Sequence, residues 1–150
     1  MNRWMSPPVA FAVAVIAMWW IGRSVAIGRY SFAHQTAIGI ALVVLGVAIV
    51  GVSLRSFAVM GTTPDPTQPQ KATELVTSGV YSLSRNPMYV GDVVMLAGIA
   101  VWFENVFGLV PLAAFVLFID RFQIPAEEQP LADIFGDRYT AYRSKVRRWL

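Results

Sequence analysis

The polar stretch at residues 75–91 holds the residue types that are best suited to bind a polar ligand. It begins with turn-forming residues, carries the cation Arg85, and contains an Asn86-Pro87 step that forces a turn or a helix start. Proline suits the first turn of a helix because its missing N–H costs nothing there. The free N–H groups of that turn can bind an anionic group. The stretch therefore predicts a polar site where an apolar helix begins.

A second polar cluster consists of the adjacent carboxylates Glu127 and Glu128. They are either ordinary acids at a helix N-terminus, which the helix dipole favours, or one of them binds a cationic or hydroxyl-bearing ligand. The chain has no Cys and a single His, His34, which excludes a thiolate site and a His-rich metal site. No nucleophile–base pair and no Gly-rich phosphate loop is apparent. The residues alone predict a polar pocket and leave its reaction open.

The composition indicates an integral membrane protein with one domain over residues 1–150. Hydrophobic residues make up 56% of the chain and charged residues 14%, against about 25% charged in a typical soluble domain. The apolar residues are concentrated in long uncharged runs. Most of the net charge of +3 comes from loops and the C-terminal region, which indicates membrane topology and contact with membrane lipids, and argues against nucleic acid binding.

We expect an all-α fold with about four transmembrane helices, at residues 6–22, 36–54, 87–103 and 106–119. The last two are separated by Glu104-Asn105 alone, so they should form a tight antiparallel hairpin. Asp92 lies one turn inside the third segment, where it either snorkels to the interface or contributes to the site. Small residues of the second segment are spaced for close helix contact: Gly39, Ala41, Gly46, Ala48 and Gly51.

Two polar regions flank these segments. The Pro-rich run at residues 61–69 cannot be a regular helix and is either a linker or a lid over the site. Residues 125–150 have apolar side chains at three- and four-residue steps and many cations. This pattern predicts an amphipathic helix lying on an anionic membrane surface. Because the cations favour one side, both termini and the polar stretch are expected to be cytoplasmic.

The order and spacing of the motifs resemble the isoprenylcysteine carboxyl methyltransferase family, whose wider group includes membrane phospholipid methyltransferases. The resemblance covers about residues 62–149. Its motifs are LVTSGVY (75–81), RNPMYVG (85–91), the glutamate pair, and the following Leu131, Phe135, Gly136, Tyr139, Tyr142 and Val146. Each motif is weak alone, but their combination with a four-span pattern is specific.

The resemblance implies methyl transfer from S-adenosylmethionine to a lipophilic acceptor, a carboxylate, amine or thiol of an isoprenoid- or lipid-like molecule. Residues 73–76 would line the adenosyl part of the cofactor, and Glu127 would bind one of its polar groups. The implied cofactor-binding residues are Thr73, Glu74, Leu75, Val76, Tyr81, Arg85, Asn86, Pro87, Met88, Tyr89 and Glu127. Arg121 and Glu128 are the implied catalytic residues, with Arg121 or Arg85 orienting an anionic acceptor.

Two departures from the family pattern bear on the chemistry. The family's usual His before Pro is Asn86 here, which cannot titrate, so a proton-shuttling role is excluded at this position. Gln123 stands where the animal enzymes carry an Arg proposed to meet the substrate carboxylate. This replacement puts a prenylcysteine carboxylate substrate in doubt.

Two other functions remain open. The chain could be a non-catalytic membrane binding or assembly module that keeps the fold, which the absence of an obvious base favours. It could also be an NADPH-dependent membrane reductase, because sterol reductases have a distantly similar C-terminal layout. That enzyme should need more cations for a 2′-phosphate than the polar stretch offers.

Overall fold

The computed structural model describes residues 6–62 and 74–150, so Thr73 and most of the Pro-rich run lie outside the described residues. The regular secondary structure of the described residues is helical, apart from an isolated bridge between Arg29 and Asn105. Its α-helices are α1 (Pro7–Ser24), α2 (Gln35–Met60), α3 (Pro87–Trp102), α4 (Leu109–Phe118), α5 (Ile124–Phe135) and α6 (Asp137–Lys145). Short 3₁₀ turns form η2 (Gly79–Ser82) and η3 (Val106–Gly108), and a π-helical turn forms η4 (Ile119–Gln123).

Three helical stretches are long and apolar enough to cross a membrane: α1, α2, and the continuous stretch Val106–Phe135. The fourth predicted span, α3, has 16 residues. At 1.5 Å per residue it is about 24 Å long, which is less than the ~30 Å of a hydrocarbon core. Of the four or so predicted transmembrane helices, three are therefore long enough to be candidates for spans, and the fourth, α3, is a shorter apolar helix.

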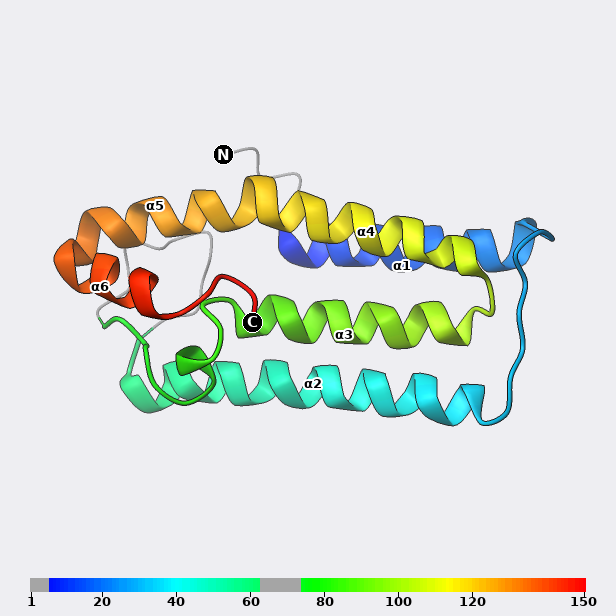
Figure 1. The fold of residues 1–150 in the computed structure, drawn as a ribbon, viewed down its shortest axis with the longest axis horizontal. Helices are drawn as coiled ribbons and strands as arrows, with labels where there is room; N and C mark the ends of the chain where they lie inside the picture. Colours follow the sequence, from blue (N-terminus) through cyan, green and yellow to red (C-terminus); the bar gives the residue numbers. More distant parts are fainter. Residues whose placement is uncertain (1–5, 63–73) are drawn as a thin grey trace.

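The short α3 lies between its longer neighbours (Figure 1). It packs against α2 on one side and against α1 and α4 on the other. The predicted antiparallel hairpin of α3 and α4 is confirmed. In Figure 1, α2 and α5 both extend beyond the first residue of α3, and η2 and α6 lie at that same end. The first turn of α3 therefore lies away from the end of the bundle that α2 and α5 reach.

The predicted close packing of small residues is confirmed for two positions of α2. Gly39 and Gly46 lie against Gly98 and Gly91 of α3, and we call these four residues the glycine seam. A Cβ atom added at Gly46 would lie 2.6 Å from the carbonyl oxygen of Gly91, and one added at Gly98 would lie 2.6 Å from that of Gly39. The two backbones therefore approach too closely for any side chain.

The prediction is wrong for the other small residues of this set. Ala41 and Ala48 are exposed, and a Cβ atom at Gly51 would meet nothing in the described chain within 4 Å. Only one face of α2 contacts α3, so the small residues on its other faces meet no other helix of the described chain.

The fourth segment does not end near Ile119 as predicted. The helix continues through η4 into α5 and ends at Phe135. Asp120 does not interrupt it because two C-terminal side chains bind its carboxylate. Nη1 of Arg148 lies 3.2 Å from Oδ1 of Asp120, and Nε1 of Trp149 lies 3.0 Å from the same oxygen.

The tail is not the single amphipathic helix predicted for residues 125–150. Gly136 has φ +49° and separates α5 from α6, a conformation that a residue with a side chain rarely adopts. α6 ends at Lys145, and the chain then returns in an extended conformation to the start of α3. The apolar residues Tyr139 and Tyr142 are buried against Leu75, so they face the protein and not a lipid surface.

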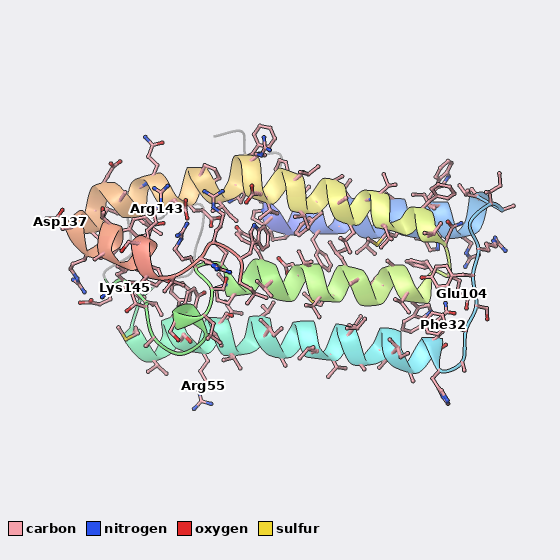
Figure 2. All side chains as sticks on the ribbon, viewed as in Figure 1. Phe32, Arg55, Glu104, Asp137, Arg143 and Lys145 are labelled. Atoms are coloured by element: carbon pink, nitrogen blue, oxygen red, sulfur yellow. The ribbon has the colours of Figure 1, made fainter. Side chains whose placement is uncertain are left out.

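The two ends of the bundle differ in character. Figure 2 shows Asp137, Arg143 and Lys145 at the end where α3 begins, and Glu104 and Phe32 at the opposite end. At that opposite end the buried Asn105 amide donates to the carbonyl oxygens of Val25 (2.8 Å) and Ile27 (3.2 Å). Between the ends the outer surface is apolar, as a lipid-facing surface requires, and exposes Val13, Ile16, Trp20, Val44, Val47, Val110 and Leu117.

Candidate functional site

A cavity of about 580 Å³ lies at the end of the bundle where α3 begins. This volume falls within the ~300–1,000 Å³ of small-molecule sites. Its walls come from α1, α2, α3, α5, α6, η2 and residues 74–76. The structure brings ten predicted site residues to this cavity: Glu74, Leu75, Val76, Tyr81, Arg85, Asn86, Met88, Tyr89, Glu127 and Glu128. The motifs that are far apart in sequence therefore surround one space.

Glu127 is held in position by two neighbours. The Tyr89 hydroxyl donates to its Oε1 at 2.5 Å, and Nε2 of Gln123, one turn earlier, donates to the same oxygen at 2.6 Å. Among the residues that the structure describes, none donates to Oε2 of Glu127. One oxygen thus fixes the carboxylate, and the other is available to a ligand in the cavity.

Tyr81 presents a polar atom that lacks a partner. Its hydroxyl is buried and has no hydrogen-bond partner among the described residues. Its ring packs edge-on against Phe57 of α2, with centroids 5.3 Å apart, and its carbonyl oxygen accepts from the Tyr142 hydroxyl at 2.6 Å. A buried polar group without a partner costs free energy, so this hydroxyl is suited to meet a polar ligand atom.

Four charged residues form a network of ion pairs, and two of them, Arg85 and Glu128, line the cavity. Glu128 accepts from Arg85 at Oε1 (2.7 Å) and from Arg148 at Oε2 (3.0 Å), and Arg148 also reaches Asp120. The side chains of Arg85 and Glu128 are only 9% and 10% exposed. We call Arg85, Asp120, Glu128 and Arg148 the charged clasp. Because the two oxygens of Glu128 bind Arg85 and Arg148, this residue stabilises the cavity wall.

Backbone groups of the C-terminal residues complete the clasp. Nη1 of Arg85 donates to the carbonyl oxygens of Arg143 (3.1 Å) and Val146 (2.8 Å). The side-chain amide of Asn86 donates to the carbonyl oxygen of Arg148 at 3.0 Å. Asn86 therefore joins the C-terminal segment to the start of α3. This role requires a hydrogen-bond donor but no side chain that gains or loses a proton.

α6 supplies two buried aromatic residues to the cavity wall. Burial raises the pKa of the Tyr139 hydroxyl to about 12 and also raises the pKa of Tyr142. Both phenols are consequently neutral at physiological pH and act as hydrogen-bond donors with apolar rings. The hydrogen bond from the Tyr142 hydroxyl to the Tyr81 carbonyl oxygen holds α6 against η2.

The sequence profile of the phospholipid methyltransferase family matches residues 34–138, more than half of the chain. The chain belongs to this family. Curated relatives include protein-S-isoprenylcysteine O-methyltransferases. The one from Xenopus laevis is 43% identical over 74 residues, which are 48% of this chain and 25% of the relative. Protein-S-isoprenylcysteine O-methyltransferase B of Arabidopsis thaliana is 34% identical over 73 residues, 49% of this chain and 37% of the relative.

A third relative is shorter. A Haemophilus influenzae protein, named only as uncharacterized, is 40% identical over 63 residues, which are 42% of this chain and all of that protein. The match with the named methyltransferases spans well under half of their length. No solved structure is significantly similar to the chain.

Two predicted site residues do not line the cavity, and a third lies outside the described residues. Pro87 is buried at the first turn of α3, where it starts the helix. Arg121 lies outside the cavity lining and its side chain is 74% exposed. Thr73 lies outside the described residues. The other predicted site residues of this methyltransferase family member all line the cavity.

Several lining residues were not assigned to the site from the sequence. They are Phe11, Val50, Leu54, Phe57, Leu131, Met95, Tyr139, Tyr142 and Asp92. Leu131, Tyr139 and Tyr142 belong to the motifs singled out above, whereas Phe11, Val50, Leu54, Phe57 and Met95 carry no sequence signal that separates a cavity wall from ordinary helix packing. Asp92 did carry a signal, because an acidic residue inside an apolar helix is unusual.

Proposed function

We propose that the protein transfers a methyl group from S-adenosylmethionine to a lipophilic acceptor at the cytosolic membrane face. Membership of the phospholipid methyltransferase family, which in general uses this cofactor, supports the proposal. The observation that carries it is the meeting of Tyr81, Tyr89 and Glu127 around one cavity. These residues come from three motifs spread over 47 positions, and packing alone does not require their polar atoms to converge.

The residues of the cavity fit the chemistry of the cofactor. S-adenosylmethionine has a sulfonium, an ammonium, a carboxylate and a ribose. The open Oε2 of Glu127 suits a cation or a ribose hydroxyl, and the Tyr81 hydroxyl lacks a partner among described residues. Aromatic faces stabilise cations. The first N–H groups of α3, next to Met88 and Tyr89, suit a carboxylate.

The cavity also has an apolar part that suits a lipophilic acceptor. Phe11 of α1, Val50 of α2 and Met95 of α3 line it. These helices are apolar segments, so an acceptor is expected to enter from the bilayer while the cofactor enters from the polar end. The cations of α6 and the C-terminal segment lie at that polar end, which favours a cytosolic orientation for it by the positive-inside rule.

The cofactor would supply a methyl group on a sulfonium, whose carbon a nucleophile can attack directly while S-adenosylhomocysteine leaves. The protein's contribution is then to position the two reactants and to exclude water. Glu127, held by Tyr89 and Gln123, orients the bound molecule. The clasp keeps α5 against the start of α3 and so maintains the distance between Glu127 and the first turn of α3.

The test is release of S-adenosylhomocysteine by purified protein supplied with membrane extract as the source of acceptor. Glu127→Gln should lower turnover by about tenfold or more, because a neutral amide replaces the carboxylate that Tyr89 and Gln123 hold in the cavity. The matched control is Glu104→Gln, which removes a carboxylate at the opposite end of the bundle and should leave turnover unchanged.

The outcomes also separate the enzyme from a non-catalytic module. Acceptor-dependent turnover that falls in Glu127→Gln alone supports the proposal. A folded wild-type protein that neither binds S-adenosylmethionine nor turns it over contradicts the proposal and favours the module. Equal turnover in wild type and Glu127→Gln contradicts the assigned site.

A further inference from the structure

A second cavity, of about 320 Å³, lies at the surface between the last turns of α2 and the start of η2. We call it the surface groove. Its lining residues are Val52, Arg55, Ser56, Val59 and Met60 of α2, together with Ser78 and Gly79. None of these seven residues lines the larger cavity. Because the groove combines a cation and hydroxyl groups with apolar side chains, its composition suits a molecule that has a polar head and an apolar chain.

Arg55 lies at the depth where lipid headgroups begin. It is the only charged residue of α2. The 20 residues 35–54 precede it in the helix without a charge. At 1.5 Å per residue they extend about 30 Å, which is the thickness of the hydrocarbon core of a bilayer. The guanidinium group therefore stands at the boundary of that core, where the phosphate groups of the lipids are found.

The face of α2 that carries Arg55 is exposed and apolar. Figure 2 shows Arg55 pointing outward from α2, away from α3. Val44, Ala48 and Val52 are exposed and precede Arg55 at four- and three-residue steps, so they share its face of the helix. This row leads from Arg55 toward the middle of the membrane. An acyl chain can lie along it while the headgroup stays at the level of Arg55.

The polar groups of the surface groove suit a phosphate and its headgroup. A guanidinium group can bind two phosphate oxygens at once. The Ser56 hydroxyl donates to the Val52 carbonyl oxygen at 3.1 Å, whereas the exposed Ser78 side chain does not cap η2. Ser78 can therefore turn its hydroxyl toward a headgroup beside Arg55. Gly79, with φ +62°, adds no side chain that would fill this space.

We propose that the surface groove binds one anionic phospholipid, whose phosphate pairs with Arg55, whose headgroup reaches Ser78 and whose acyl chain lies along α2. The bound lipid joins α2 to η2 on the outer side of the larger cavity. Ser56 lines the groove, and the next residue, Phe57, packs against Tyr81 in the wall of the larger cavity. The inference goes beyond the proposed methyl transfer and does not depend on it, because the two cavities share no lining residue.

The experiment measures the affinity of the first bound lipid by native mass spectrometry. Full-length protein in detergent is mixed with phosphatidylglycerol or with phosphatidylcholine of the same acyl chains. Wild type should bind phosphatidylglycerol about fivefold more tightly, which is the contribution of one arginine beside an anionic headgroup. Arg55→Gln should reduce this preference to near unity, and Arg55→Lys, which keeps the charge, should retain most of it. Equal affinity of wild type for the two lipids would overturn the proposal.

Two controls identify the source of the preference. Arg143→Gln removes an exposed arginine of α6, at the same end of the bundle and outside the groove lining, and it should keep the wild-type preference. An equal loss in Arg143→Gln and Arg55→Gln would assign the preference to overall charge and overturn the proposal. Glycerol 3-phosphate, which has no acyl chain, should not displace the bound lipid. Displacement would make the groove a site for a soluble phosphate and would also overturn the proposal.

Discussion

The two sides of α3 are held by different forces. On the α2 side, the glycine seam brings backbones together without polar side chains. At the start of α3, the charged clasp joins three distant parts of the chain through ion pairs and backbone carbonyl oxygens. In lipid, apolar helices gain little from the hydrophobic effect, so close packing must hold the seam. The glycine seam thus fixes α3 against α2, whereas the charged clasp forms a polar wall beside the cavity at the start of α3.

Breaking the clasp is expected to have the largest effect on stability. Arg85→Met leaves the buried Glu128 with Arg148 as its remaining ion-pair partner in the described chain and also removes donors from two carbonyl oxygens. Loss of one partner of a buried ion pair typically costs about 3–5 kcal/mol. The thermal midpoint of the protein in detergent should fall accordingly. Arg147→Met, which changes a neighbouring exposed arginine outside the clasp, is the control and should unfold at the wild-type temperature.

A double variant sharpens this prediction. Arg85→Met combined with Glu128→Met removes both charges of the pair, so no buried carboxylate is left with an incomplete set of partners. The double variant should therefore be more stable than Arg85→Met alone. If both variants unfold at the same temperature as wild type, the clasp does not hold the end of the bundle.

The glycine seam should be the next most sensitive feature. In Gly46→Ala the new methyl group would lie 2.6 Å from a backbone oxygen of α3, which a side-chain rotation cannot relieve. Overpacking of this kind costs about 1–3 kcal/mol. Gly51→Ala is a matched control on the same helix, where nothing in the described chain lies within 4 Å. Heating both variants in detergent should show a lower midpoint for Gly46→Ala only, and a common midpoint would refute the seam.

The smallest predicted effect is on the affinity for S-adenosylmethionine and not on stability. Tyr89→Phe removes the hydroxyl that donates to Glu127 at 2.5 Å. A hydrogen bond to a charged group contributes about 1.5–3 kcal/mol, and Gln123 still holds the same oxygen, so affinity for S-adenosylmethionine should fall about tenfold. Tyr30→Phe, which removes a hydroxyl bound to the Ala100 carbonyl oxygen outside the cavity, should leave the affinity unchanged. An unaltered affinity in Tyr89→Phe would show that Tyr89 does not position Glu127.

The sequence predicted the parts of the fold that depend on local hydropathy. α1 and α3 match the predicted segments within two residues at each end, and the hairpin follows from the short Glu104-Asn105 link. The path beyond Ile119 was wrong because it depends on contacts distant in sequence. Arg148 and Trp149 bind Asp120, and this pairing lets a charged residue stand within a continuous helix. Gly136 was the available sign that the tail divides into separate helices.

For the site too, the sequence predicted which residues belong together but not the contacts between residues that are distant in sequence. Motif order indicated that Tyr81, Tyr89 and Glu127 belong together, and the structure brings them to one cavity. The engagement of Arg85 and Glu128 with each other was not predictable, because either residue alone looks like a ligand-binding charge.

The most direct test of the account is a calorimetric titration of S-adenosylmethionine into full-length, detergent-purified protein. The account predicts micromolar binding to wild type and to Glu104→Gln, and at least a tenfold weaker affinity in Glu127→Gln, whose side chain lines the cavity with one oxygen open. Absence of binding to folded wild-type protein, or equal binding by Glu127→Gln, would contradict the claim that this cavity holds the methyl donor.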